Sequence, residues 1–317
     1  MKRSEITMKS AGIDVSKATL DVALGARDER LKTANRAQAF AALVEWLNSH
    51  GVGRVGLEAS GGYERAVAEH LRSLGFEVVI HQPAEVRAYA RFKRIKAKND
   101  RIDAKVIALA TAQVEAVKAA NDPRLVELAE WFTAYEQAAD RLAQMKTCLE
   151  HVTLDALKAG LLAQLRQAQL WKAQLLRDIV KRIKACPDLA RRYALLQSLP
   201  GCGPVVAASL LIRMPELGRL PHGRAASLIG VAPWDRDTGQ SSGKRHIGGG
   251  RGRPRRMLYI AALAASRFDP GLRAFAQRLR AAGKPPKVAL AALMRKLVEA
   301  ANLILARATP WVTNPVL

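Results

Sequence analysis

The feature that most constrains the fold is a long stretch, residues 125–185, that contains no proline and a single glycine. Apolar side chains recur in it at helical spacing, beginning with Leu128 and Trp131. This pattern predicts two long helices or a helical hairpin, bounded by Pro123 and Pro187. Such a hairpin would separate an amino-terminal part of the chain from a carboxy-terminal part.

Charge is spread unevenly along the chain. Its 317 residues include 51 Lys and Arg against 28 Asp and Glu, a formal net charge of +23. Residues 1–120 carry a net charge of +6 and residues 121–190 one of +1, whereas residues 191–317 carry 21 basic against 5 acidic side chains. This balance predicts a polyanionic partner, held mainly by the last third. The near-neutral middle suits a spacer or a dimerising coiled coil.

Membrane, disulfide and zinc roles find no support in the sequence. The first residues, MKRSEITMKS, lack the apolar region of a signal peptide, and no apolar run approaches the roughly 20 residues of a spanning helix. The three cysteines, Cys148, Cys186 and Cys202, are far apart and form no CxxC pair. We therefore expect a cytoplasmic protein whose partner is nucleic acid rather than a membrane.

Short β-like runs alternate with helical stretches in the amino-terminal part, which predicts an α/β sheet that begins with a hairpin. The expected strands are 11–15, 20–24, 54–59 and 76–80, and the expected helices are 39–50, 63–74 and 83–92. The carboxy-terminal part is expected to be mostly helical. It has a helix, a glycine-rich turn and a helix over 195–214, a polar loop over 235–256, and helices over 257–266 and 288–306.

Four acidic residues stand out by their position. Asp14 lies in an apolar strand, Glu58 ends another, and Asp100 and Asp103 are three residues apart on one face of a predicted helix. Taken singly, each is more simply a turn, cap or first-turn residue. An acid in an apolar strand is costly unless it is paired or bound to a metal, and oxygen ligands suit Mg²⁺ or Mn²⁺. Together the four could form an acidic cage that holds a metal against a scissile phosphate.

Several segments resemble one known family. GIDVSKATLDVAL, GLEASGGYERAVAEHL, GFEVVIHQPAEVRAYA and KAKNDRIDAKVIALA are similar to the amino-terminal domain of DEDD transposases of the IS110 group, in its IS1111 branch, which is related to the pilin-gene invertase. LPGCGPVVAASLL and SSGKRHIGGGRGRPRRMLYIAALAASR resemble the carboxy-terminal transposase domain of that family. The match covers nearly the whole chain.

The resemblance implies an α/β plus all-α architecture in three domains. Residues 1–122 would form a ribonuclease-H-like (RuvC-type) catalytic domain, residues 123–190 a helical coiled-coil spacer for dimerisation, and residues 191–317 a small α-helical transposase domain. The DEDD set of the family maps onto the four acids named above, as catalytic residues and as ligands of Mg²⁺ or Mn²⁺.

In this family a hydroxyl group of the carboxy-terminal domain is thought to attack DNA and form a covalent intermediate. Its motif is acid–Ser–Gly, and the matching position here is Thr238, which departs from serine. Threonine carries the same hydroxyl with a hindering methyl group. We expect Thr238 to be the nucleophile. The alternatives are Ser241, Ser242 or an impaired copy, and without the resemblance the simplest interpretation is that these hydroxyls satisfy turn backbone.

Basic side chains and glycines near these motifs are candidate phosphate contacts. The turn in LPGCGPVVAA resembles a helix-hairpin-helix turn, although a Pro-Gly-x-Gly turn is often only a tight connection. The predicted nucleic-acid-binding residues are Lys96, Lys98, Arg101, Gly201, Gly203, Lys244, Arg245, Arg251, Arg253, Arg255 and Arg256.

The sequence thus predicts a site-specific DNA transposase of an insertion sequence that acts on donor and target DNA. The resemblance further implies target choice by a bridge RNA, and a homo-oligomer, a dimer or a tetramer, whose active site is composed across subunits. Two alternatives stay open. One is a RuvC-like metal-dependent nuclease in which water attacks, and the other is a non-catalytic nucleic-acid-binding protein.

Overall fold

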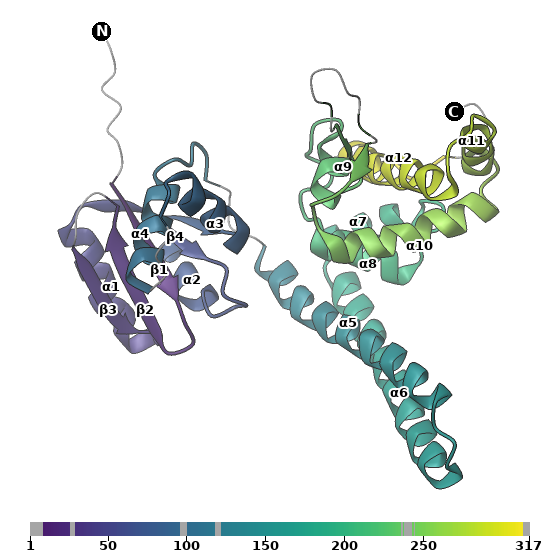
Figure 1. Ribbon diagram of the computed structural model, residues 1–317, viewed down its shortest axis with the longest axis horizontal. Helices are drawn as coiled ribbons and strands as arrows, with labels where there is room; N and C mark the ends of the chain where they lie inside the picture. Colours follow the sequence, from purple (N-terminus) through teal and green to yellow (C-terminus); the bar gives the residue numbers. More distant parts are fainter. Residues whose placement is uncertain are drawn as a thin grey trace. The chain divides into compact units, whose positions relative to one another are not determined.

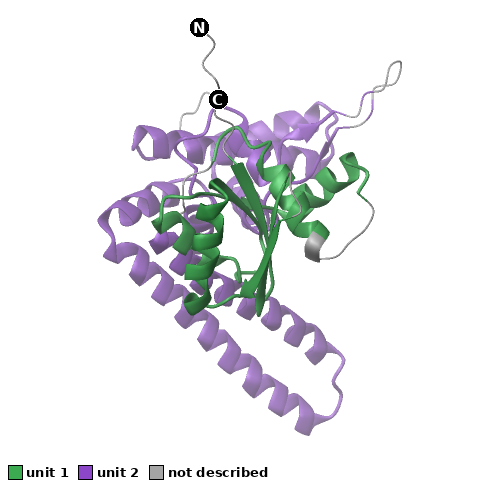
Figure 2. Cartoon of the chain, turned by 90° about the vertical axis from the view of Figure 1, so that its left-hand side faces the viewer, with its two compact units in different colours: residues 1–120 green, residues 121–317 purple. Residues whose placement is uncertain are grey.

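The computed structural model describes residues 9–25, 29–95, 100–117, 122–235, 237, 243 and 245–312, with the side chains of Asp100 and Arg101 outside that description. The chain divides into two compact units, residues 1–120 and residues 121–317, shown in green and purple in Figure 2. Each unit has a hydrophobic core of its own.

Unit 1 is a mixed α/β structure around a five-stranded sheet of order β3-β2-β1-β4-β5 (Figure 1). The first three strands form an antiparallel meander, and β4 and β5 run parallel to β1. The elements are β1 (Lys9–Val15), β2 (Thr19–Leu24), β3 (Arg30–Ala34), α1 (Ala37–Ser49), β4 (Val52–Glu58), α2 (Arg65–Ser73), β5 (Glu77–His81), α3 (Pro83–Phe92) and α4 (Asp100–Thr111). The predicted α/β sheet that begins with a hairpin is confirmed.

The edge strand β3 is absent from the sequence-based prediction. RLKTA has two apolar residues, Leu31 and Ala34, and none of its five residues is buried, so it lacks the apolar run that marks the expected strands. It pairs with β2 through backbone hydrogen bonds, which any sequence can form.

Successive side chains of a strand point to opposite faces of the sheet, and in unit 1 the two faces differ. One face carries branched apolar residues such as Ile13, Val22 and Leu57, which form the core with α1 and α2. The other face carries Gly12 and Gly56, and α4 packs on it across β1, β2 and β4. This second face therefore holds a helix close to the strand backbones.

Unit 2 is largely helical, as expected. Its elements are α5 (Pro123–Glu150), α6 (Asp155–Ala185), α7 (Pro187–Gln197), α8 (Pro204–Arg213), α9 (Arg224–Ile229), β6 (Pro233–Trp234), β7 (His246–Ile247), α10 (Gly252–Phe268), α11 (Pro270–Ala281) and α12 (Pro286–Arg307). Helices α5 and α6 pack against each other as the predicted hairpin (Figure 1). A coiled-coil role in dimerisation stays a prediction.

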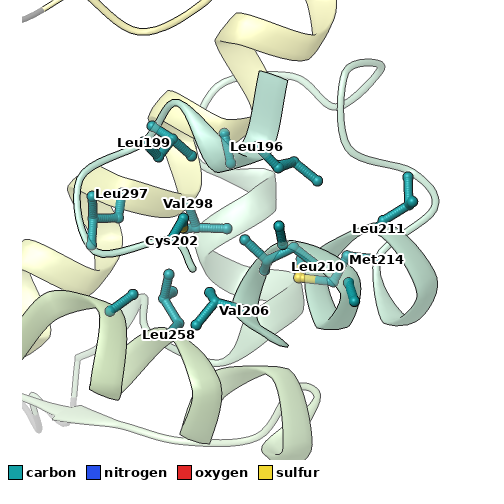
Figure 3. Close-up of a cluster of buried hydrophobic side chains, with 14 of the residues drawn as sticks. Leu196, Leu199, Cys202, Val206, Leu210, Leu211, Met214, Leu258, Leu297 and Val298 are labelled. Carbon is teal, nitrogen blue, oxygen red and sulfur yellow. The ribbon is translucent and has the colours of Figure 1, made fainter. Parts of the chain in front are cut away.

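The base of the hairpin shares one core with the helices that follow it. Phe132 of α5 and Ile179 of α6 are fully buried in the same cluster as Leu210 of α8 and Leu258 of α10. Cys202 lies in the turn between α7 and α8, and its side chain is buried in that cluster (Figure 3). Burial raises the pKa of Cys202 to about 12, so this thiol is an inert packing group.

Candidate catalytic carboxylates and the hydroxyl-bearing loop

Asp14 and Glu58 stand at corresponding positions of two neighbouring parallel strands. The ladder of β1 and β4 aligns Gly12 with Gly56 and Ile13 with Leu57, and the two acids come next on each strand. Parallel strands in register point equivalent side chains to the same face. Both carboxylates therefore lie at the carboxyl ends of β1 and β4, on the face that α4 covers, and both are partly buried.

Two glycines set the position of α4 on that face. A Cβ atom on Gly12 would collide with the Ala104 carbonyl oxygen and the Ala108 amide, and one on Gly56 would collide with the Thr111 hydroxyl. The hydroxyl of Ser10, two residues before Gly12 on β1, donates to the Ala108 carbonyl at 3.2 Å. The helix thus runs antiparallel to β1.

This direction places the first turns of α4 at the end of β1 that carries Asp14. Asp103 directly precedes Ala104, the residue that faces Gly12. The packing therefore brings Asp103 toward the ends of β1 and β4, on the same side of the sheet as Asp14 and Glu58. Asp100 lies one turn earlier in α4, and its side chain lies outside the described part of the structure.

The chemistry of this set fits a hard divalent cation, since carboxylate oxygens are the donors that Mg²⁺ and Mn²⁺ prefer. Among the side chains that the structure describes, no three His, Cys, Asp or Glu residues gather at metal-binding distance. The fourth predicted ligand, Asp100, is not among those side chains.

The loop that follows Glu58 is fixed by a second carboxylate. Glu64 accepts hydrogen bonds from the Ser60 amide at 3.0 Å, the Ser60 hydroxyl at 2.9 Å and the Gly62 amide at 2.9 Å. Partial burial opposes ionisation of Glu64, but these hydrogen bonds outweigh it and lower its pKa. The segment ASGGYE is therefore an ordered turn beside the candidate site.

Asp21 is a carboxylate of this face that sequence reasoning missed. It lies directly opposite Asp14 in the antiparallel ladder of β1 and β2, and Lys32 of β3 forms an ion pair with it at 3.2 Å. Like charges directly opposite each other destabilise a sheet, and Lys32 offsets the charge of Asp21. The alternation in LDVAL, with an acid between apolar residues, was the available signal.

In the sequence, the hydroxyl candidates fall between β6 and β7, two short strands of unit 2 that form a ribbon. Strands β6 and β7 pair Pro233 with Ile247 and Trp234 with His246. Thr238, Ser241, Ser242 and Lys244 lie outside the described residues, as do Lys96, Lys98 and the side chain of Arg101 in unit 1.

Several predicted phosphate contacts instead bind their own chain. Arg251 forms a two-pronged pair with Glu216 at 2.6 and 2.8 Å, Arg253 pairs with Glu136 at 2.7 Å, and Arg255 donates to the Gly249 carbonyl at 2.6 Å. Arg245 pairs with Asp235 at 2.5 Å, and Arg256 with Asp140 at 3.4 Å. These guanidinium groups hold the ribbon and α10 in place. A phosphate-binding role for them stays a prediction.

The two glycines of the predicted helix-hairpin-helix turn differ in their surroundings. Gly201 has a positive φ of +77°, and a Cβ atom there would collide with the Ala261 carbonyl of α10. Its role in the structure is therefore close packing. Gly203 is the N-cap of α8 and has open space around it, which leaves it accessible.

Comparison with known families decides between the classes of protein that this geometry allows. Residues 11–157 match a family profile described as "Transposase", and residues 193–277 match one described as "Transposase IS116/IS110/IS902 family". The chain belongs to the IS110 family of transposases. The first match covers the carboxylate face of unit 1, and the second covers the hydroxyl-bearing loop of unit 2.

Named relatives of this IS110-family chain include two proteins of nearly the same length. It is 27% identical to the pilin gene-inverting protein of Moraxella bovis, over 95% of this chain and 96% of the relative. It is 26% identical to the pilin gene-inverting protein of Moraxella lacunata over the same shares. A 43.6 kDa insertion element IS110 protein of Streptomyces coelicolor is 31% identical over 38% of this chain and 31% of that protein.

Helices α5 and α6 are the longest in the transposase. Within the part of the chain that the structure describes, neither these nor any other helix is long and apolar enough to cross a membrane.

Proposed function

We propose that this transposase is a site-specific DNA recombinase that cuts and rejoins DNA, with the catalytic carboxylates in a ribonuclease-H-like unit 1. The observation that carries the proposal is the placement of Asp14 and Glu58 side by side at the ends of parallel strands. Helix α4, which bears Asp100 and Asp103, lies across those strands on two glycines. The names of the Moraxella relatives, which describe inversion of a gene, support the same activity.

Each part of the chain has a separate task in this reaction. Asp14, Glu58, Asp100 and Asp103 would hold Mg²⁺ or Mn²⁺, which when bound supplies Lewis-acid polarisation of the scissile phosphate. The Thr238 oxygen would form a bond to phosphorus as the phosphorus–oxygen bond to the leaving strand breaks. The hydroxyl proton ends on the leaving DNA oxygen. Attack by a DNA hydroxyl on this ester would rejoin the strands and release Thr238, which conserves the bond energy.

The partners we propose follow from the family resemblance and from charge. The strongly basic residues 191–317 suit donor and target DNA, and also a bridge RNA that selects the target. We further propose a homo-oligomer, a dimer or a tetramer, in which the hairpin of α5 and α6 acts as the coiled-coil spacer.

One observation favours a second candidate function. The family motif has serine where this chain has Thr238, a more hindered nucleophile. If Thr238 is inert, the same carboxylates would serve a RuvC-like nuclease in which water attacks the phosphate. A non-catalytic nucleic-acid-binding protein is the third possibility.

A covalent-trapping experiment separates these functions. The substrate is radiolabelled DNA spanning the junctions that flank the gene, with a nick placed so that the cleaved strand diffuses away. With Mg²⁺ present, we expect a protein–DNA adduct on denaturing gels that Thr238→Ala abolishes and a Ser241→Ala/Ser242→Ala double variant retains. Asp14→Asn should lower adduct formation by at least about 100-fold, because a transition-state stabilisation of several kcal/mol is lost, and it should still bind DNA.

Other outcomes would contradict the proposal. Cleavage at full rate when Thr238, Ser241 and Ser242 are all alanine would support the hydrolytic nuclease. Binding without any cleavage, unaffected by Asp14→Asn and Asp103→Asn, would support the non-catalytic protein.

A further inference from the structure

Trp234 presents a large apolar surface to solvent at the base of the hydroxyl-bearing loop. The residue is 56% exposed, and the exposed His246 lies opposite it on the ribbon. Trp171 of helix α6 is exposed to the same degree, 55%. The two tryptophans differ in their surroundings, because Trp171 lies in the near-neutral residues 121–190 and Trp234 in the strongly basic residues 191–317.

The backbone that carries Trp234 is held rigidly. Its indole N–H donates to the Gly248 carbonyl at 3.3 Å. Arg255 then ties the Gly249 and Gly230 carbonyls together, at 2.6 and 3.2 Å. A Cβ atom on Gly250 would collide with the Gly230 backbone, and one on Gly230 would collide with the Gly249 carbonyl and the Arg255 guanidinium. The orientation of the ring is therefore set by hydrogen bonds to described backbone.

The charge around the ribbon suits a strand of nucleic acid. Residues 191–317 hold only 5 acidic side chains. Asp235, next to Trp234, is paired with Arg245 at 2.5 Å, and Glu216 is paired with Arg251 at 2.6 Å. An exposed aromatic ring held by a hydrogen bond, in a segment of the chain with a large excess of basic residues, is a usual platform on which proteins stack unpaired bases.

We propose that Trp234 stacks on an unpaired base of the DNA strand that the enzyme cuts, and so fixes the scissile phosphate near the nucleophile. The proposal rests on the DNA recombinase function proposed above. Thr238 follows Trp234 by four residues, so their Cα atoms can lie at most ~14 Å apart. That span is about four nucleotide spacings of one strand at ~3.4 Å each, so the stacked base lies within a few nucleotides of the cut. Duplex DNA would have to release a base to be held in this way.

The test compares two fluorescein-labelled probes of equal length, oligothymidylate and a fully abasic oligomer with the same phosphates. Fluorescence anisotropy with the full-length protein gives both affinities. We expect Trp234→Ala to weaken binding of oligothymidylate roughly 5- to 150-fold, the range for loss of one base–aromatic stack, and to leave the abasic probe unchanged. Trp234→Phe should retain most of the affinity. Trp171→Ala, matched in exposure, should bind both probes as the wild type does.

Each other result overturns the inference in a recognisable way. Equal loss on both probes, or equal loss in Trp171→Ala, means that Trp234 does not read a base. A change in sedimentation without a change in DNA affinity assigns Trp234 to a contact between copies of this chain. A loss seen only with an oligouridylate RNA probe assigns it to RNA. If the wild type binds neither DNA probe, the stacking inference fails, whereas the recombinase function fails only if the covalent-trapping experiment gives no adduct.

Discussion

The buried histidine of unit 1 shows how a single residue can tie the sheet to α4. His81 pairs with Glu58 in the ladder of β4 and β5, and its Nε2 lies 2.8 Å from the Thr111 hydroxyl. That hydroxyl already donates its proton to the Ile107 carbonyl at 2.7 Å. His81 must therefore be the donor, which the neutral ring with a proton on Nε2 can be. Burial lowers the pKa of His81, although Glu85 opposes the shift.

This pKa predicts the pH dependence of stability. The unfolded chain takes up a proton at about pH 6.5 and folded His81 only at a lower pH, so its contribution is present above about pH 6.5 and is lost as the pH falls below that value. We expect His81→Gln, which keeps a donor, to reduce this acid sensitivity. Urea unfolding, followed by circular dichroism at several pH values between 5 and 8, measures how the free energy of unfolding depends on pH. The exposed His151→Gln is the control, and identical pH profiles for His81→Gln and the wild type would contradict the assignment.

At the scale of elements, the docking of α4 depends on residues without side chains. Gly12 and Gly56 let the helix approach β1 and β4 to backbone contact, and the branched residues of the opposite face could not. The approach carries Asp103 to the acids at the strand ends. A glycine inside a strand usually weakens that strand. It often marks a site where another backbone approaches closely, as α4 does here.

Gly12→Ala should therefore damage both stability and activity. We expect a loss of about 1–3 kcal/mol in the free energy of unfolding, because an overpacked contact must push α4 away. DNA cleavage should fall with it, since Asp103 moves with the helix. Gly160→Ala is the matched control. Gly160 lies in α6 with open space around it, so alanine should stabilise the helix by about 0.5–1 kcal/mol. Equal effects of the two substitutions in denaturant melts would contradict the close-packing argument.

At the scale of the whole molecule, one buried carboxylate adds ion pairs to the apolar core that the helical hairpin shares with the rest of unit 2. Glu136 of α5 accepts from Arg213 of α8 and from Arg253 of α10, both at 2.7 Å, across 77 and 117 residues of sequence. Arg213 also lies over the Phe132 ring. Two cations that share one buried anion leave uncompensated charge when the anion is removed.

Glu136→Ala should lower the free energy of unfolding of the protein by about 2–4 kcal/mol, somewhat less than for a fully buried pair because Arg253 is half exposed. Asp140→Ala, one turn further along α5, removes only the exposed pair with Arg256 and should change stability by less than about 0.5 kcal/mol. Guanidinium unfolding of both variants measures the difference. Similar values would mean that the hairpin is held by apolar packing alone.

Several features of the fold could be predicted because they are written in local patterns. The proline-free stretch predicted the hairpin of α5 and α6, and alternating apolar residues predicted β1, β2, β4 and β5. Motifs identified the family, which the profile matches confirm. The edge strand β3, the short elements β6, β7 and α9, and helix α11 escaped prediction. Strands β6 and β7 are two residues long, too short for a periodic pattern, and β3 is held by backbone pairing with β2 and buries none of its side chains.

By itself, the sequence determined which residue types are available: the acids, the hydroxyls and the basic carboxy-terminal third. Only the tertiary structure decided their partners. Strand register set Asp14 beside Glu58 and placed Asp21 opposite Asp14, and glycine packing gave α4 its direction. The structure also bound Arg251, Arg253 and Arg255 to their own chain. The reason is that the sequence states how many charged residues a segment has. Which partner each charged side chain binds depends on how segments far apart in the sequence pack together.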